Sequence, residues 1–384
     1  PLCHMFIQYL EVRTSHWERY SAVNERFAAA VAEEAARVGG SPMVWIQDYH
    51  FALAPALIRA LVPDALIHHF WHIPFPPPDV FRLIAFDVHD ALLHGLLGND
   101  LLEFQTEGYV RNFLDCVERL MPGHVDYGAS TVDFQGRVIR VAAFPISIDV
   151  GEWERLASLP RTREVTASLR TRYAADGHKL LVSVDRVDYT KGIVRRLRAL
   201  EHVWAESAAR RESFTVLLVA TPSRTDVPAY ADLEREVMQY VDAINDRFGT
   251  EKWRPIVLVH DNVDADLLAA VYAAADVCLV SSLQDGMNLV AKEFIACQAG
   301  GDGVLVLSRF TGAADELDGA VLVNPFFIDA FAEGICTALD MPPDERRERM
   351  VVMRERLLSW TIQDWMDAVL GAAQNVRTNV AGAR

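Results

Sequence analysis

The sequence has 384 residues, 51% of them hydrophobic, and 37 Lys and Arg residues stand against 53 Asp and Glu residues. This length favours two or three domains with cores of their own, and the apolar share excludes long intrinsic disorder. A formal net charge of −16 argues against general nucleic-acid binding, which needs a basic surface, although a phosphate pocket needs only a few cations.

The cysteine content and the N-terminus bear on location. The five cysteines are irregularly spaced and include no CxxC pair, which argues against a disulfide framework or a zinc ribbon and favours a reducing, cytoplasmic compartment. No uncharged apolar run is long enough to cross a membrane. The N-terminus does not resemble a signal peptide and begins inside an amphipathic pattern without an initiator Met, so we expect the chain to lack its natural start.

The first half of the chain mixes helical and strand patterns. Apolar residues at helical spacing predict a helix over 19–38, and residues 43–47 predict a short strand. The segment 65–78 is predicted to be a strand that runs into a loop, because its three consecutive prolines fit neither a helix nor a central strand. Alternation over 130–145 around Gln135 and Gly136 predicts a β-hairpin.

The second half alternates aliphatic strands and helices more regularly. Near-continuous aliphatic strands separated by helices imply a parallel sheet that is covered on both faces. Such sheets bind ligands at the carboxyl ends of their strands. The predicted strands cover 179–184, 214–220, 255–260, 277–282, 303–308 and 320–325.

The fold class is therefore α/β, with two Rossmann-like domains. The first domain is expected over 1–147 and the second over 148–355, with a crossover near 144–160. A last helix, charged on one face, is expected over about 344–373. The C-terminal segment 356–384 is expected to pack back onto the first domain.

The most informative stretch for the chemical function is VCLVSSLQDGMNLVAKEFIACQAG (277–300). A strand is expected to end near Ser282 and a helix to begin near Leu289, so a loop leads into a helix N-terminus. Unpaired amides at a helix N-terminus bind anions and suit a diphosphate. The amides expected to face outward belong to Met287, Asn288, Leu289 and Val290.

Two further residues of this stretch support the same interpretation. Gly286 lets the backbone approach a ligand closely, and Glu293 lies one turn into the helix, where it can reach ribose hydroxyls. A purely structural interpretation of these residues is about as well supported as the functional one. In it, Asp285 and Asn288 only cap the helix, and Glu293 is a solvated acid favoured by the helix dipole.

Cations follow two neighbouring strands of the second half. Arg186 and Lys191 lie on one loop after the first strand, where they could clamp a diphosphate leaving group. The alternative is a pair of surface cations bonded to Asp185 and Asp188. Arg224 follows the next strand. Its position is as consistent with an ordinary loop arginine as with a functional cation.

Polar residues also follow the strands of the first half. Asp48 and Tyr49 come just after one strand, and His72 comes just after the next, before a rigid proline loop that would hold its ring in place. His68 and His69 lie within that strand and are expected to be packing residues. No spacing of His, Cys, Asp and Glu resembles a metal site.

These motifs resemble one family over nearly the whole chain. WIQDYH, FWHIPFP, EFQTEGYVRNFLDC, AFPISID, VDRVDYTKG, ATPSR, DGMNLVAKE, VLSRFTGAADEL and VNP occur in the same order in trehalose-6-phosphate synthases. The resemblance implies a GT-B glycosyltransferase, whose two Rossmann-like domains face each other across a cleft. It further implies transfer of glucose from a nucleotide sugar, usually UDP-glucose, to glucose 6-phosphate with an α,α-1,1 linkage.

The resemblance also implies a role for each motif residue. Arg186 and Lys191 would hold the donor diphosphate, Glu293 the ribose, and His72 the donor glucose. The implied loop around the donor sugar and phosphates consists of Asp285, Gly286, Met287, Asn288, Leu289 and Val290.

On the acceptor side, the resemblance assigns Asp48 and Tyr49 to the sugar and Arg224 to its phosphate. It favours a retaining, front-face attack in which the donor phosphate oxygen receives the acceptor proton. No metal and no cofactor are then required, because Arg186 and Lys191 take the place of a metal. The implied catalytic set is Arg186, Lys191, His72, Asp48 and Asp285.

Two departures from the family leave alternatives open. The glycine-rich N-terminal stretch that reads the acceptor phosphate is not found before Pro1, and Gln284 stands where many members carry a cation. A glucosylglycerol-phosphate synthase using glycerol 3-phosphate, or a non-catalytic regulator that binds sugar phosphates, therefore remains an alternative. The expected partners are UDP-glucose, or GDP- or ADP-glucose, and glucose 6-phosphate, with no nucleic acid and no membrane; a homo-oligomer is left open.

Overall fold

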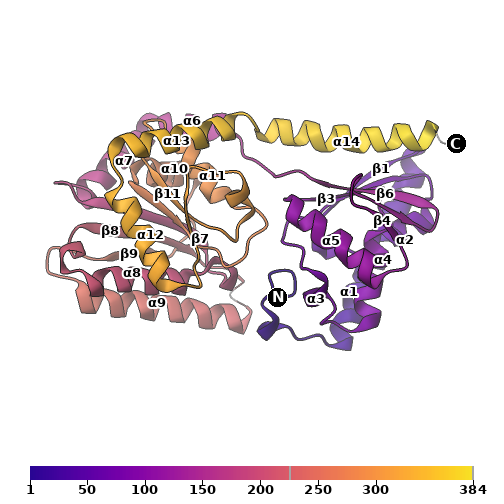
Figure 1. Cartoon of the computed structure of the whole chain (residues 1–384), viewed down its shortest axis with the longest axis horizontal. Coiled ribbons are helices and arrows are strands. Elements are labelled where there is room, and N and C mark those ends of the chain that lie inside the picture. Colours follow the sequence, from indigo (N-terminus) through magenta and orange to yellow (C-terminus); the bar gives the residue numbers. More distant parts are fainter. Residues whose placement is uncertain (225, 383–384) are drawn as a thin grey trace. The chain divides into compact units, whose positions relative to one another are not determined.

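The computed structural model of the chain describes residues 1–224 and 226–382. These residues form two compact units, one built from Pro1–Ile146 and the segment that starts at Asp364, the other from Ser147–Gln363. Within the described residues, each unit contains a six-stranded sheet with helices packed on it (Figure 1). The predicted α/β class with two Rossmann-like domains is confirmed.

The sheet of the first unit has the strand order β1-β2-β3-β6-β5-β4. The strands β1, β2, β3 and β6 run parallel, and β4, β5 and β6 pair antiparallel. The predicted hairpin is the β5–β6 pair, whose turn residues Gln135 and Gly136 both have positive φ, as a tight hairpin requires. The strands are β1 (Met43–Gln47), β2 (Leu66–Phe70), β3 (Leu101–Phe104), β4 (His124–Asp126), β5 (Thr131–Phe134) and β6 (Arg137–Ala143).

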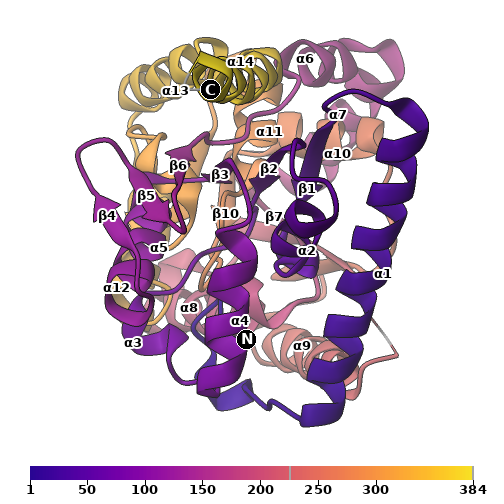
Figure 2. The same ribbon diagram turned by 90° about the vertical axis from the view of Figure 1, so that its right-hand side faces the viewer.

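Helices cover both faces of this sheet (Figure 2). Leu66 and Leu101 pack against α14, whereas their strand neighbours Ile67 and Leu102 pack against helices of the other face, because successive strand residues point to opposite faces. The helix expected over 19–38 is present and starts five residues earlier. The helices are α1 (Thr14–Val38), α2 (Ala54–Leu61), α3 (Pro78–Phe81), α4 (Phe86–Leu96), α5 (Glu107–Leu120) and α14 (Ile362–Gly382).

The sheet of the second unit is parallel throughout, with the order β12-β11-β10-β7-β8-β9. The predicted strands are confirmed, and the four inner ones (β11, β10, β7 and β8) are buried along nearly their whole length. All carboxyl ends lie at one edge and all amino ends at the other, so two separate loop surfaces result. The strands are β7 (Lys179–Arg186), β8 (Phe214–Thr221), β9 (Ile256–Val259), β10 (Val277–Val280), β11 (Val304–Ser308) and β12 (Val321–Val323).

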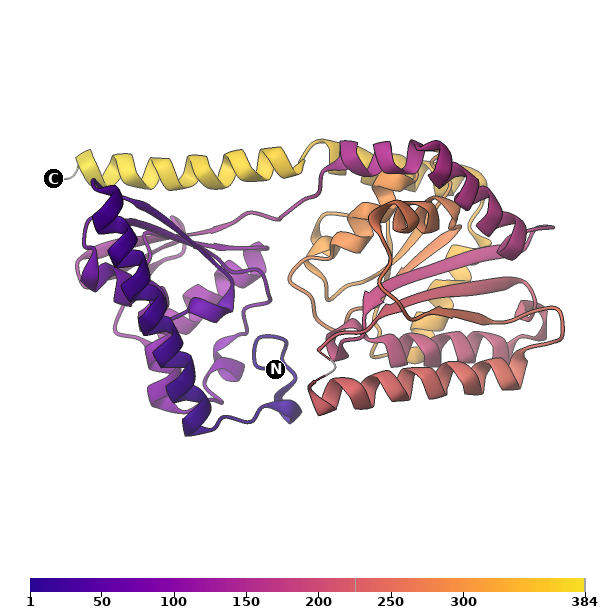
Figure 3. The same ribbon diagram turned by 180° about the vertical axis from the view of Figure 1, so that it is seen from behind.

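Two helical layers enclose this second sheet (Figure 3). The helices α8, α9 and α12 share one apolar core with β7, β8, β10 and β11, and the remaining helices cover the other face. No helix in the described part of the chain combines the length and apolarity needed to cross a bilayer. The helices are α6 (Val150–Ser158), α7 (Pro160–Tyr173), α8 (Ile193–Glu206), α9 (Pro228–Phe248), α10 (Ala265–Ala274), α11 (Leu289–Cys297), α12 (Ile328–Asp340) and α13 (Pro343–Leu358).

The prediction of a single last helix over 344–373 is wrong. Two helices stand there, α13 and α14, with a break at residues 359–361. The buried positions Met353, Leu357, Trp365 and Val369 keep a helical spacing across the break, which explains why the sequence pattern conceals it. The break separates helices of different cores, because α13 belongs to the second unit and α14 packs in the first.

Trp365 fastens α14 to the first unit. Its side chain is buried, its Nε1–H donates to the Phe144 carbonyl oxygen at 3.1 Å, and its ring meets Phe70 edge-on at a centroid distance of 5.2 Å. We expect Trp365→Ala to lower the free energy of unfolding of this unit by about 3–5 kcal/mol, the usual cost of emptying a buried aromatic site. Denaturant titration checks this, with exposed Asn375→Ala on the same helix as control. Equal effects of the two changes would contradict the anchoring role.

Candidate active site

Two predicted motifs of the second unit meet at the carboxyl edge of its sheet. Lys191 lies in the turn after β7, and Asp285 lies in the loop between β10 and α11. The Lys191 Nζ donates to Asp285 Oδ2 at 2.6 Å. Ser282 Oγ and Asn288 Nδ2 donate to the same oxygen at 3.2 and 3.1 Å. One carboxylate oxygen therefore ties the DYTKG loop to the DGMN loop.

Lys191 is a largely buried ammonium group and not a surface cation. Its side chain is 18% exposed. Burial alone would lower the pKa of Lys191, but the Asp285 and Asp185 carboxylates outweigh burial, and the pKa is raised. The group therefore keeps its charge at neutral pH. The alternative of a surface cation bonded to Asp185 and Asp188 is wrong for this residue.

The support beneath Lys191 is an arginine that the sequence analysis did not single out. Arg196 of α8 is buried; its Nη2 donates to Asp185 Oδ2 at 2.7 Å and its Nε to Ser281 Oγ at 2.9 Å. The same guanidinium donates to the Lys191 carbonyl oxygen at 3.4 Å. The available signal was an arginine on the apolar face of a helix that follows the motif. Arg196 thus holds in place both Asp185, which precedes the DYTKG loop, and Lys191, which lies within that loop.

Gly192 is required by the same turn. It has a φ of +66° at the start of α8, and a Cβ at this position would lie 2.3 Å from the Ser281 carbonyl oxygen. Any other residue would be strained in the left-handed region and would collide with the backbone. Gly192, the last residue of the DYTKG motif, therefore allows the turn that carries Lys191 to pack directly against the end of β10.

The helix start expected near Leu289 is present. Asn288 is the N-cap of α11, and its Oδ1 accepts from the Ala291 N–H at 3.0 Å, so the structural alternative describes Asn288 correctly. Asp285 accepts from the Lys191 ammonium group. Helix geometry leaves the first-turn amides of Leu289 and Val290 without an intrahelical acceptor. Gly286 and Met287 are buried in the loop just before them.

Glu293 is not a solvated acid. Its Oε2 accepts from the Tyr272 hydroxyl at 3.0 Å, and burial raises the pKa of its carboxyl group, although the tyrosine opposes that shift. A carboxylate held in this way presents acceptor oxygens in a fixed direction, as recognition of a diol requires. Tyr272 was not identified from the sequence, because it lies in another helix, α10.

The two other predicted cations follow their strands as expected. Arg186 ends β7 and is exposed. Arg224 follows β8 with a positive φ, and its Nη1 donates to the Tyr230 hydroxyl at 2.9 Å. Tyr230 in turn donates to Asp188 Oδ2 at 3.4 Å, which links Arg224 to the DYTKG loop. Tyr230 orients this arginine and was missed, since it lies in α9.

In the first unit, two glutamines fix the protonation state of His72. Gln105 Oε1 accepts from the Ile146 N–H at 2.9 Å, so its amide NH₂ group faces His72 Nδ1 at 3.4 Å. Nδ1 must then accept, and Nε2 carries the hydrogen and donates to Gln47 Oε1 at 2.7 Å. Burial lowers the pKa of His72, against the opposing Asp48 carboxylate. The ring is therefore held as a neutral imidazole, which the sequence did not reveal.

Asp48 adopts a strained backbone conformation, with φ 62° and ψ 179°. This region is normally open only to glycine, so surrounding contacts must hold it. The Asp48 N–H donates to the Phe70 carbonyl oxygen at 2.7 Å, and His69 Nε2 donates to the Asp48 carbonyl oxygen at 2.8 Å. Asp48 Oδ1 accepts from the His72 N–H at 3.2 Å. The strain fixes the carboxylate beside the histidine.

The residues around Asp48 are held by buried groups. Tyr49 follows in a single 3₁₀ turn, and its carbonyl oxygen accepts from the Tyr20 hydroxyl at 2.8 Å. His68 and His69 are fully buried, as expected of packing residues. His68 Nδ1 lies 3.3 Å from Glu103 Oε2, while burial lowers the pKa of His69 to about 4 and keeps it neutral. Among the described residues, no group of three or more His, Cys, Asp or Glu side chains could hold a metal ion.

Comparison with known proteins gives one consistent family. The family model of glycosyltransferase family 20 matches residues 1–375. A trehalose-6-phosphate synthase of Mycobacterium avium is 40% identical over 97% of this chain and 76% of its own length. An α,α-trehalose-phosphate synthase (UDP-forming) of Botryotinia fuckeliana is 36% identical over 99% and 72%.

Solved structures agree with these relatives. An α,α-trehalose-phosphate synthase (UDP-forming) from Burkholderia xenovorans, in complex with glucose 6-phosphate, superposes with a TM-score of 0.90 at 36% identity, covering 97% of this chain and 81% of the other. A structure from E. coli with UDP-2-fluoro glucose bound gives a TM-score of 0.89 at 31% identity, covering 97% and 81%.

The neutral state of His72 can be tested by changing one of its glutamines. Gln105→Glu keeps an acceptor for the Ile146 N–H and replaces the NH₂ donor by a carboxylate oxygen. We expect the pKa of His72 to rise, because the carboxylate favours the protonated ring that Gln105 now disfavours. NMR titration of the ring measures this, and His50→Gln at an exposed neighbouring position removes one histidine signal and simplifies the assignment. An unchanged or lowered pKa would contradict the assigned hydrogen-bond directions.

Proposed function

The chain belongs to glycosyltransferase family 20, and we propose that it transfers glucose from UDP-glucose to glucose 6-phosphate and forms α,α-trehalose 6-phosphate. The names of the curated relatives support this substrate pair, and so do the ligands bound in the two solved structures. A cytoplasmic location is part of the proposal, and the five free cysteines agree with a reducing compartment.

The ion pair between Lys191 and Asp285, at 2.6 Å, carries the proposal. It joins two loops at the carboxyl ends of β7 and β10, the edge at which parallel sheets bind nucleotides. The ammonium group and the first-turn amides of Leu289 and Val290 then offer fixed positive charge to one diphosphate. Glu293, oriented by Tyr272, supplies the acceptor for ribose hydroxyls.

The reaction that fits these groups is a front-face substitution. The bond between C1 of glucose and the departing phosphate oxygen breaks, and the acceptor 1-hydroxyl oxygen bonds to C1 on the same face, so the configuration is retained. The hydroxyl proton passes to the departing phosphate oxygen. Lys191 and Arg186 stabilise the charge on the leaving diphosphate, and neither a metal nor a cofactor is needed.

The remaining residues position the substrates. We assign the acceptor phosphate to Arg224, whose guanidinium is oriented by Tyr230. Asp48 and Tyr49 serve the acceptor sugar. Neutral His72 contacts the donor glucose, exchanging its hydrogen bond with a glutamine for one with a sugar hydroxyl.

A grid of donors and acceptors tests the function. UDP-, GDP- and ADP-glucose are each combined with glucose 6-phosphate or glycerol 3-phosphate, with and without EDTA, and the products are identified by NMR. We expect trehalose 6-phosphate with an α,α linkage from UDP-glucose and glucose 6-phosphate, at a rate that EDTA leaves unchanged. Preference for glycerol 3-phosphate would replace the proposed acceptor, and binding without any product would replace the enzymatic function by a regulatory one.

Lys191→Ala should lower kcat by about 30–1000-fold, because loss of one preorganised electrostatic donor raises the barrier by about 2–4 kcal/mol. The exposed Lys252→Ala serves as the matched control and should leave kcat unchanged. Steady-state kinetics measures both variants. Near-normal turnover of Lys191→Ala would remove this residue from the mechanism.

A second comparison separates contact with the substrate from support of Asp285. Lys191→Ala is repeated in an Asp285→Asn background, where the carboxylate that needs the lysine is gone. If Lys191 acts on the diphosphate, its removal still lowers kcat and UDP affinity in that background. If Lys191 acts only by neutralising Asp285, removing the lysine in the Asp285→Asn background causes no further loss of kcat or UDP affinity.

A further inference from the structure

Two polar side chains of α1 reach the loop that carries Asp48 and Tyr49. Tyr20 and Asn24 are four residues apart, so they lie on the same face of this helix. The helix packs against α2, and Ala28, one turn further along the same face, joins an apolar core with residues of β1, β2 and α2. Tyr20 and Asn24 therefore point toward the segment that connects β1 with α2.

Asn24 uses its whole hydrogen-bonding capacity on main-chain groups. Its Nδ2 donates to the His50 carbonyl oxygen at 3.1 Å and to the Tyr20 carbonyl oxygen at 3.0 Å. Its Oδ1 accepts from the Leu53 N–H at 3.2 Å and from the Ala54 N–H at 3.1 Å. A primary amide has two donor and two acceptor positions, and the four partners match them one to one. The amide therefore fixes His50 relative to the start of α2.

The Tyr20 hydroxyl binds the same loop at two further points. It donates to the Tyr49 carbonyl oxygen at 2.8 Å and accepts from the Ala52 N–H at 3.0 Å. Burial raises the pKa of Tyr20 to about 12, so the hydroxyl keeps its proton and remains a donor at neutral pH. Trp17, one turn earlier, stacks on the Tyr20 ring at a centroid distance of 5.6 Å. The hydroxyl thus ties Tyr49 to Ala52 from a fixed position.

An asparagine is an unfavourable choice at this position of α1 unless its bonds are needed. Asn24 is fully buried within a 25-residue helix, whose other buried positions on the same face are Ala28 and Ala35. Alanine has a higher helix propensity than asparagine and buries no polar side-chain group. Alanine would therefore serve the packing of α1 on α2, and the amide of Asn24 serves the loop.

The loop needs support from α1 because Asp48 is strained. Its φ of 62° and ψ of 179° form a combination that persists only where several neighbouring contacts hold it. Bonds with the end of β2 and with the His72 N–H fix Asp48 itself. Tyr20 and Asn24 fix the residues that follow it, so the chain cannot relax in that direction either.

We propose that Tyr20 and Asn24 are positioning residues for the acceptor: they hold the loop in the conformation in which Asp48 and Tyr49 face the acceptor sugar. This inference rests on the proposed function, which assigns Asp48 and Tyr49 to that sugar. Both side chains bind main-chain groups, so they determine where the loop lies and leave the chemistry of its own side chains unchanged. Their effect is confined to the acceptor, because the groups proposed for the diphosphate belong to the second unit.

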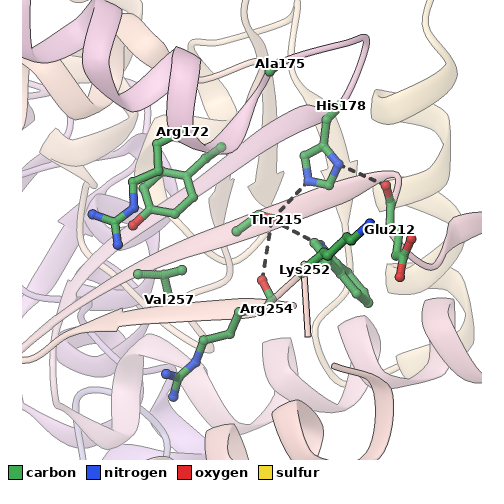
Figure 4. A pocket seen from close by; sticks show the side chains of 10 residues that line it. Arg172, Ala175, His178, Glu212, Thr215, Lys252, Arg254 and Val257 are labelled. Atoms are coloured by element: carbon green, nitrogen blue, oxygen red, sulfur yellow. Dashed lines mark hydrogen bonds between the residues drawn. The ribbon is translucent and has the colours of Figure 1, made fainter. Parts of the chain in front are cut away.

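A polar network of the second unit shows how a purely structural arrangement differs. Thr215 Oγ1 lies 3.0 Å from His178 Nε2, beside a hollow at the amino edge of the second sheet (Figure 4). Trp253 Nε1 donates to the same oxygen at 3.1 Å. This network joins the starts of neighbouring strands at the edge opposite Lys191 and Asp285. The network around Asn24, by contrast, ends on a loop that carries two proposed site residues.

Tyr20→Phe tests the proposal, because it removes one hydroxyl and keeps the ring. We expect the pKa of His72 to fall further below its ordinary value, since the Asp48 carboxylate opposes the lowering and would move away as the loop relaxes. NMR titration of the His72 ring measures this without any substrate. The result is therefore independent of whether the proposed reaction occurs.

Tyr127→Phe is the matched control in the same unit. The Tyr127 hydroxyl lies 2.8 Å from Asp115 Oδ1 and 2.7 Å from Glu118 Oε2, and its side chain is partly buried, like that of Tyr20. Loss of this hydroxyl should leave the pKa of His72 unchanged. Equal pKa values of His72 in the unmodified chain and in Tyr20→Phe would overturn the proposal.

Steady-state kinetics gives the second readout. Tyr20→Phe should raise the KM for glucose 6-phosphate at least about fivefold, the effect of losing roughly one hydrogen bond, while the KM for UDP-glucose stays within about twofold. A purely structural role would lower the melting temperature and leave both constants of the folded protein unchanged, which would overturn the acceptor role. Absence of turnover in the unmodified chain would refute the proposed function, and the His72 titration would still decide the positioning.

Asn24→Ser covers the case in which Tyr20→Phe does not fold. A serine hydroxyl can still donate to the carbonyl oxygen one turn earlier in the helix, so fewer buried groups lose their partners than with alanine. The same lowered pKa of His72 is expected. Failure of both variants to fold would assign the pair to the folding of the first unit and overturn the positioning role.

Discussion

A buried lysine that keeps its charge organises the second unit. Removing an ammonium group from water is costly, and the cost is offset only where a carboxylate lies close and its remaining lone pairs are satisfied. Asp285 meets both conditions, because its Oδ2 accepts from Lys191, Ser282 and Asn288. Beneath it, Arg196 neutralises Asp185 and holds the Lys191 carbonyl oxygen. Two ion pairs in series thus fix a positive charge at the strand ends before any substrate arrives, as electrostatic preorganisation requires.

The first unit achieves a fixed geometry by a different route, through backbone strain and neutral groups. Asp48 sits in a conformation that only glycine adopts freely, and contacts from His69, Phe70 and His72 hold it there. His72 is neutral because one glutamine donates to it and another accepts from it. A neutral imidazole can bind sugar hydroxyls both as a hydrogen-bond donor and as an acceptor, whereas a protonated ring could only donate.

The sequence predicted the parts of the molecule that local patterns encode. Aliphatic strands, the hairpin at Gln135 and Gly136, and the loop that ends in Asn288 all follow from periodicity, turn residues and capping. Arg196, Tyr272 and Gln105 were missed because each acts on a motif from another element, and only the packing of helices on the sheet brings them together. The break between α13 and α14 was missed for a related reason: apolar spacing continues through it, and which core each helix joins is a tertiary property.

The formal charge of −16 and the phosphate chemistry proposed for the carboxyl edge of the second sheet do not conflict. Charges separated by more than a Debye length of about 8–10 Å are largely screened, so the field inside a small hollow depends on the few groups around it. At the carboxyl edge these groups are Lys191 and the first-turn amides of α11. A net negative charge disfavours an extended polyanion, which would contact many surface charges at once, whereas a small phosphorylated molecule meets only the groups of its own site. Net charge therefore decides which class of anion can approach, and buried cations decide where one is held.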